Sequence, residues 1–86
     1  MDEYDMVNEH QREMSLYREW TIAVGALQHV NKLRAEHEAT GCTAKECRRR
    51  HDRLQDIAIR QEQDCYSRWV RACNELDQRL RRKGVI

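Results

Sequence analysis

Apolar residues recur every three or four positions along the first half of the chain. They comprise Met6, Val7, Met14, Leu16, Tyr17, Trp20, Ala23, Val24, Leu27, Val30 and Leu33. This spacing aligns side chains along one side of an α-helix. The pattern therefore predicts a first helix over about residues 5–39.

A short break at Gly41 separates this series from a second one. Glycine readily adopts the left-handed backbone conformation that often ends a helix. Residues 43–46 then fit a capping box, in which a Thr hydroxyl and a Glu carboxylate each accept from a free backbone N–H. The second series steps by threes, fours and sevens through Cys47, His51, Leu54, Ala58, Cys65, Trp69, Ala72, Leu76 and Leu80. We expect a tip at 40–43 and a second helix over about 44–83.

Two long helices joined by a short turn predict an all-α antiparallel helical hairpin, coiled-coil-like, as a single domain over residues 1–86. If the chain folds at Gly41, residues whose numbers add to about 83 lie opposite each other, such as Tyr17 and Tyr66. The same register brings the acidic start of the chain beside its basic end, and many weak ion pairs would favour it over a slipped one. The charged residues concerned are Asp2, Glu3, Asp5, Arg79, Arg81, Arg82 and Lys83.

The composition is typical of long, solvated helices. The 86 residues include no Pro, no Phe and 3 Gly, and 36% are charged, although the net charge is only +1. Such a composition disfavours a compact sheet or barrel. A chain this short hides only about 60% of its unfolded surface on folding, so a staple or a partner is expected to support it.

The start of the chain indicates a location. An acidic N-terminus is unlike a secretory signal, and no window approaches the apolar length of a membrane span. We therefore expect a protein of the reducing cytoplasm that does not enter a membrane. All four Cys lie between residues 42 and 73, so no disulfide can join the two arms, and free thiols or metal ligands are the better interpretation.

Two imidazoles and two thiols gather around the predicted tip, at His37, Cys42, Cys47 and His51. This is a ligand set of structural zinc, which would staple the two arms at their joint. Cys47 and His51 also suit ordinary seam positions, and His37 is favoured at a helix C-terminus. We therefore expect no cofactor, with structural zinc at these four residues as the alternative.

The middle of the hairpin is apolar on more than one side. We call Ile22, Gly25, Ala26, Ile57 and Ile59 the central band. A two-helix hairpin covers only one side of each helix, so we expect the band to drive dimerisation into a four-helix bundle or to enter a groove of a larger protein. The alternative is local packing around a first helix kinked at Gly25.

A cluster of arginines follows the tip. We call Arg48, Arg49, Arg50 and Arg53 the arginine shoulder, and we expect it to bind an acidic surface of a partner. Arginine also binds phosphate in bidentate fashion, which makes nucleic acid an alternative partner. The low net charge and the lack of interleaved aromatic residues argue against nucleic acid.

Motifs of catalysis are missing from the sequence. It contains no glycine-rich phosphate loop, no HExxH and no paired ExxH, and a two-helix rod has no pocket in which to desolvate a substrate. Small proteins without such motifs, including those of phages and mobile elements, often act as regulators or inhibitors. We therefore expect a non-enzymatic module that occupies a surface of a larger protein or complex. A nucleic-acid-binding hairpin and a structural assembly subunit are the alternatives.

Overall fold

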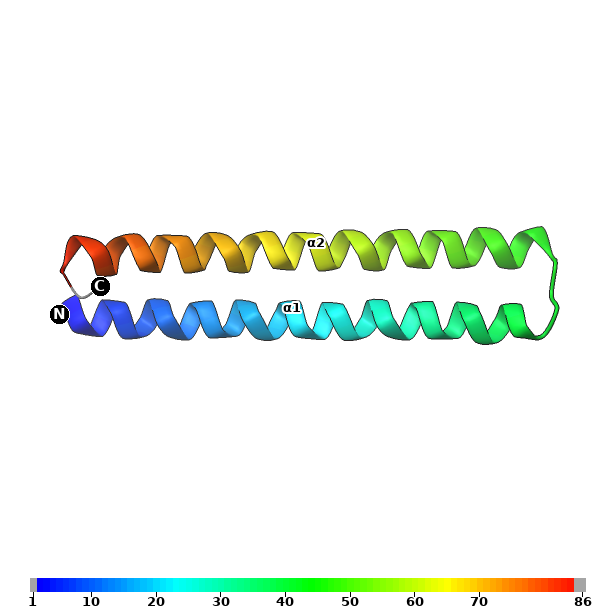
Figure 1. The fold of residues 1–86 in the computed structure, drawn as a ribbon, viewed down its shortest axis with the longest axis horizontal. Helices are drawn as coiled ribbons and strands as arrows, with labels where there is room; N and C mark the ends of the chain where they lie inside the picture. The colour runs from blue at the N-terminus through cyan, green and yellow to red at the C-terminus, as the bar shows by residue number, and fades with distance from the viewer. Residues whose placement is uncertain (1, 85–86) are drawn as a thin grey trace.

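The computed structural model describes the backbone of residues 2–84 and the side chains of residues 6–84. It consists of two antiparallel helices, α1 over Asp2–Ala39 and α2 over Lys45–Arg82. They lie side by side along their full length in a rod of 60 × 18 × 13 Å (Figure 1). The predicted all-α hairpin is confirmed, with both ends of the chain at one end of the rod and the tip at the other.

The turn after α1 has the expected conformation. Gly41 has a φ of 79°, in the left-handed region. The backbone N–H groups of Thr40 and Gly41 donate to the carbonyls of His37 and Glu38 at 3.1 and 3.0 Å. The Thr40 hydroxyl also donates to the His37 carbonyl, at 2.6 Å. The end of α1 is therefore closed by hydrogen bonds that bend the chain toward α2.

The start of α2 differs from the prediction. Its N-cap is Ala44, and no side chain caps the helix. The predicted capping box is therefore wrong. Because the helix begins one residue later than the box requires, Thr43 lies outside the N-cap position and Glu46 occupies the second helical position.

The inward-facing side chains of both helices alternate steps of three and four residues. In α1 they are Met6, Glu9, Glu13, Leu16, Trp20, Ala23, Leu27, Val30, Arg34 and His37. In α2 they are His51, Gln55, Ala58, Glu62, Cys65, Trp69, Ala72 and Leu76. This is a heptad seam. Ala23 and Ala58 are its buried apolar residues within the described part of the chain, with 8% and 5% exposure.

Four aromatic rings form the largest cluster on the seam. The indoles of Trp20 and Trp69 stack with their planes 8° apart and their centroids 5.2 Å apart. Tyr17 packs edge-on against Trp69 at 5.1 Å, and Tyr66 packs against Trp20 at 5.4 Å. Each helix thus supplies one Tyr and one Trp to a block that fills the space between the helices.

Both indole N–H groups are satisfied across the seam. Trp20 Nε1 donates to Glu62 Oε1 at 2.8 Å, and Trp69 Nε1 donates to Glu13 Oε1 at 2.6 Å. The two carboxylates therefore belong to the packing of the aromatic cluster, although each occupies a seam position where a sequence pattern predicts an apolar residue.

A repeat in the sequence underlies this cluster. Glu13, Tyr17 and Trp20 recur as Glu62, Tyr66 and Trp69, each 49 residues later, which is seven heptads. Within each helix these three residues are spaced i, i+4 and i+7, so they occupy adjoining positions along the heptad seam. The repeat therefore gives both helices the same Glu-Tyr-Trp face. The sequence interpretation missed this signal because it compared apolar spacing alone.

The register differs from the one expected. Contacts across the seam join residues whose numbers add to about 86, as for Tyr17 and Trp69 or Arg34 and Asp52. The predicted value of about 83 is wrong by nearly one helical turn. One reason is that the connection extends to Ala44, which moves its midpoint to Cys42. The other is that a helical side chain covers a spot about one residue N-terminal to its own Cα, which raises the numbers of both partners.

The two ends of the chain are joined by an ion pair between Glu9 and Arg79. The side chains of Asp2, Glu3 and Asp5, for which similar pairs are predicted, lie outside the described residues. Neither helix, over residues 2–84, contains a stretch both long and apolar enough to cross a membrane.

Candidate functional site

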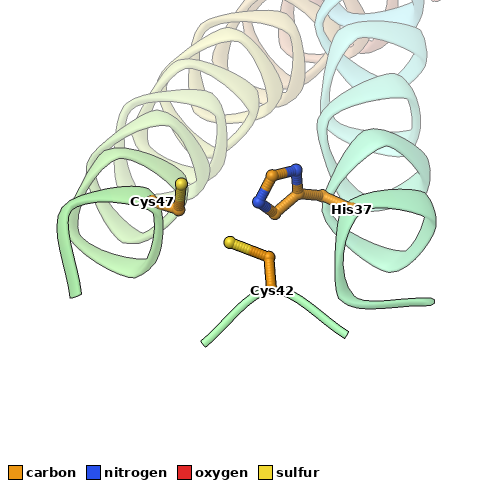
Figure 2. Close-up of side chains that lie close together, drawn as sticks. All are labelled: His37, Cys42 and Cys47. Carbon is orange, nitrogen blue, oxygen red and sulfur yellow. The ribbon is translucent and has the colours of Figure 1, made fainter. Parts of the chain in front are cut away.

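Three of the four predicted metal ligands converge at the tip. His37 comes from the last turn of α1, Cys42 from the connection and Cys47 from the first turn of α2, and their side chains point toward one another (Figure 2). One ligand atom from each lies within 4.8 Å of the other two. The structure thus gathers from three segments a group that could hold a metal ion.

Hydrogen bonding within this group is incomplete. The Nε2 atom of His37 is buried and has no hydrogen-bond partner among the described residues. The pKa of the Cys47 thiol is raised, first by its hydrogen bond with Cys42 and then by desolvation. The thiol form of Cys47 is thus favoured, and the neighbouring His37 nitrogen has no hydrogen-bond partner in the described chain.

The fourth predicted ligand, His51, lies next to this group but outside it. It follows Cys47 by one helical turn, and its ring centroid is 5.0 Å from that of His37, with the planes tilted by 48°. All four side chains line one open pocket of about 470 Å³, together with Arg34, Glu38 and Arg48. His51 therefore borders the space that an ion bound to the other three would occupy.

The arginine shoulder is exposed and uncompensated. None of Arg48, Arg49, Arg50 and Arg53 forms an ion pair with another residue in the described part of the chain, and all four are exposed. Two neighbouring acidic side chains are engaged elsewhere, because Asp52 pairs with Arg34 at 2.9 Å and Asp56 with Arg60 at 3.1 Å, whereas Glu46 lines a small pocket together with shoulder arginines. The two aspartates therefore do not compensate the charge of the shoulder.

The central band is exposed, but it does not form one surface. Ile22, Ile57 and Ile59 are 71%, 47% and 36% exposed, and Gly25 and Ala26 are exposed as well. A Cβ at Gly25 would meet no atom within 4 Å, so this glycine is not required for close packing inside the hairpin. α1 is one continuous α-helix over Asp2–Ala39 and is straight in the view of Figure 1, which gives no support to a kink.

The heptad positions assign the band to two long sides of the hairpin. Residues seven apart share a side, and residues three or four apart adjoin. Ala26 lies seven residues after Glu19, whose ion pair with Arg68 crosses one edge of the seam at 3.4 Å. Ile22 and Ile57 fall on that same side. Ile59 lies seven residues before Tyr66, on the opposite side of the hairpin.

That opposite side carries no Asp, Glu, Lys or Arg between residues 7 and 28 of α1 and between residues 59 and 73 of α2, where Asp56 and Asp77 bound it. We call it the uncharged face. Its α1 members are Val7, His10, Met14, Tyr17, Thr21, Val24 and Gln28, and its α2 members are Ile59, Gln63, Tyr66, Val70 and Cys73. At the end near the termini it continues into a groove of about 530 Å³, lined by Met6, Val7, His10, Gln11, Leu76 and Leu80.

Large apolar side chains on the uncharged face are open to solvent. Val7, Met14, Tyr17 and Tyr66 are 54%, 41%, 38% and 46% exposed. The sequence interpretation missed the face because it sought consecutive apolar residues, whereas these residues are spaced along two helices. The available signal was the lack of charge at two neighbouring heptad positions in each helix.

Comparison with protein-family models, with curated protein sequences and with solved structures found no significant match for this chain. The tip, the arginine shoulder and the uncharged face are therefore interpreted from their own chemistry.

Proposed function

We propose that this protein is a non-enzymatic binding module, a small regulator or inhibitor that occupies a surface of a larger protein. In this proposal two copies pair through their uncharged faces, and the arginine shoulder of each copy contacts an acidic partner. The uncharged face carries the proposal, because exposed Tyr, Met and Val side chains on one continuous side are typical of an interaction surface.

The area of the molecule supports a partner. Its accessible surface is 7004 Å² for a mass of 10.4 kDa. A folded monomer of this mass typically exposes about 5,400 Å², so the rod has an excess of about 1,600 Å². A standard interface buries about 1,600 Å² from both partners together. The excess on one hairpin thus equals the total area that such an interface buries.

A second copy suits this face because the face is uncharged and repeated. Twofold pairing brings each residue toward its own copy or near it, so any net charge would repel itself. The Glu-Tyr-Trp repeat also gives α1 and α2 similar sides. Four such helices can bury their apolar sides in an antiparallel bundle.

The test of the pairing is a matched pair of charge substitutions measured by sedimentation equilibrium. Ile59→Glu places a carboxylate on the uncharged face, and Ile57→Glu makes the same change two residues away on the opposite side. We expect the wild type and Ile57→Glu to be dimers and Ile59→Glu to be a monomer that remains helical. A monomeric wild type, or dissociation by Ile57→Glu alone, would contradict the proposal. Growth into larger species with concentration would favour the assembly subunit instead.

The uncompensated arginines favour an acidic partner, and they also support nucleic acid as a second candidate. The experiment is a pull-down from a lysate of the native source, with and without nuclease, using the wild type and a variant with Arg48, Arg49 and Arg50 changed to Glu. A variant with Arg81 and Arg82 changed to Glu is the control. We expect a stoichiometric protein that survives nuclease, is retained by the control and is lost from the shoulder variant.

If nuclease treatment removes all bound material, the partner of the arginine shoulder is nucleic acid and not a protein. In that case binding should fall steeply with salt, since each phosphate contact releases counterions.

The four cysteines Cys42, Cys47, Cys65 and Cys73 are free thiols, which suits a protein that functions in a reducing compartment such as the cytoplasm.

A further inference from the structure

We infer that the tip is a structural zinc site in which His37, Cys42 and Cys47 supply three ligands and His51 supplies the fourth. The inference is independent of the proposed pairing, because the tip lies beyond the last residue of the uncharged face in each helix. It starts from the convergence of one imidazole and two thiols from three separate segments.

The distances suit a tetrahedral ion after a small movement. Zinc bonds to sulfur at about 2.3 Å and to imidazole nitrogen at about 2.0 Å, which places tetrahedral ligand atoms about 3.5–3.8 Å apart. In the hairpin the three ligand atoms lie within 4.8 Å of one another. Side-chain rotations that move each atom by about 1 Å close this gap without moving either helix.

The unpartnered His37 nitrogen is an independent observation that points to a ligand. A buried polar atom without a hydrogen bond is costly, and nearly all such atoms in folded proteins have a partner. His37 Nε2 has none within the described chain. In Figure 2 one ring nitrogen of His37 points toward the two sulfur atoms, the direction from which an ion would bind it.

The chemistry of the set selects zinc. Thiolate and imidazole are borderline-soft ligands that zinc prefers over water, whereas Mg²⁺ and Ca²⁺ require oxygen ligands. Two thiolates balance the charge of one Zn²⁺. The open pocket gives the ion a path of entry, and its wall includes His51.

His51 completes the proposed coordination of zinc by four protein ligands. It lies on the same side of α2 as Cys47, one turn later, beside the His37 ring. A rotation of its side chain brings a ring nitrogen to the remaining tetrahedral position. Four protein ligands leave no open coordination position for a substrate, so the role of the ion is structural.

The benefit of such a site follows from the thin seam. Two small side chains, Ala23 and Ala58, make up the buried apolar core of the described hairpin. An ion at the tip ties the last turn of α1 to the first turns of α2 and holds the connection in place. Binding of metal by the folded form then adds to the stability of the fold.

The test is titration of the reduced, metal-free full chain with Co²⁺ alone and then with Zn²⁺. Tetrahedral cobalt gives strong visible bands, and each bound thiolate adds charge-transfer absorption in the near ultraviolet. We expect one Co²⁺ per chain, absorption from two thiolates, and displacement by one Zn²⁺. Cys42→Ser and Cys47→Ser should each halve the charge-transfer band, while Cys65→Ser and Cys73→Ser, the matched controls, should leave it unchanged.

Three results would overturn the inference: no cobalt uptake, an unchanged spectrum in Cys42→Ser or Cys47→Ser, or an equal loss in the two controls. Circular dichroism at each point of the titration distinguishes lost binding from lost folding. His51→Ala tests the fourth ligand, and we expect both thiolate contributions to remain while affinity falls at least about tenfold. Unchanged affinity would show that His51 is not a ligand.

Discussion

The aromatic middle and the tip of the hairpin both place polar atoms in the seam, but they differ in how these atoms are satisfied. In the middle, each indole N–H donates to a carboxylate of the opposite helix. At the tip, His37 Nε2 is buried and has no partner in the described chain. A satisfied polar group stabilises a fold, whereas an unsatisfied one costs free energy until something binds to it. The polar groups of the middle are therefore satisfied within the chain, whereas the tip holds the nitrogen to which the proposed zinc would bind.

The same contrast holds for charge. Around the middle, Arg68 pairs with Glu19 across the seam and with Asp64 within α2. Near the tip, the arginine shoulder has no such pairs. Charges that are compensated within a chain contribute little to recognition, while uncompensated ones attract a partner of opposite sign. Both comparisons place satisfied polar groups and paired charges in the middle and unsatisfied ones near the tip, and each of the following experiments tests that division.

The largest effect is expected in the middle. Trp20→Ala removes one half of the indole stack, and loss of a large core aromatic costs about 3–5 kcal/mol. Because a domain this small has little stability to spare, the variant should be largely unfolded at 25 °C by circular dichroism. The control is Ile22→Ala. Because Ile22 is 71% exposed, this substitution should change the free energy of unfolding by less than about 0.5 kcal/mol. Equal effects of the two changes would show that the aromatic cluster is not the core.

The next effect belongs to the tip. Zinc at a hundred times its dissociation constant should raise the free energy of unfolding by about 2.7 kcal/mol, because it binds the folded chain alone. A chelator should reverse this gain. Cys47→Ser should show no gain, and Cys65→Ser should behave as the wild type. Urea unfolding with and without zinc measures this gain in the free energy of unfolding. If zinc still stabilises the Cys47→Ser variant, the ion is bound at another site.

A smaller effect is expected when a partner in the middle is removed. Glu62→Ala leaves the Trp20 N–H without its acceptor, which should cost about 1–3 kcal/mol. Glu36→Ala is the control, since Glu36 is 60% exposed and its ion pair with Lys32 is long, at 4.0 Å, and solvent-exposed. That pair should be worth less than about 1 kcal/mol. If the two variants melt alike, the hydrogen bond to the indole contributes nothing measurable.

The smallest effect concerns thiol reactivity in the middle. Desolvation, followed by the hydrogen bond to Glu13, raises the pKa of the Cys73 thiol above its usual value. The thiolate is the reactive form, so a raised pKa means less thiolate at neutral pH and slower alkylation. In a chain whose other three Cys are changed to Ser, the rate should rise with pH later in the folded state than in urea. Coincident pH profiles would contradict this.

The pattern of residues was sufficient for the secondary structure and for the approximate location of the tip group. Helical spacing on both sides of one left-handed glycine leads to a hairpin, because neither feature depends on distant contacts. His37 and Cys47 come together for the same reason, since both lie within a few residues of the turn. His51 follows Cys47 by one turn, so its proximity was also predictable.

The register and the capping were not predictable from the pattern. A change of one residue in the start of α2 moved Thr43 out of the N-cap position. The same lengthened connection, together with the lean of helical side chains, moved the centre of the cross-seam contacts from a sum of about 83 to a sum of about 86. Side-chain direction and the length of a connection are properties of three-dimensional packing.

By itself, the sequence of this protein determined two long helices, a glycine turn and the set of His and Cys residues around it, because these depend on local spacing and backbone preference. Only the tertiary structure decided that the central band is divided between two sides and that the indoles donate hydrogen bonds to seam carboxylates. It also decided that one imidazole and two thiols meet at the tip, and that a nitrogen of this imidazole is buried without a partner in the described chain. The physical reason is that each of these depends on how one helix is rotated and shifted against the other, and that placement is set by contacts between residues far apart in the chain.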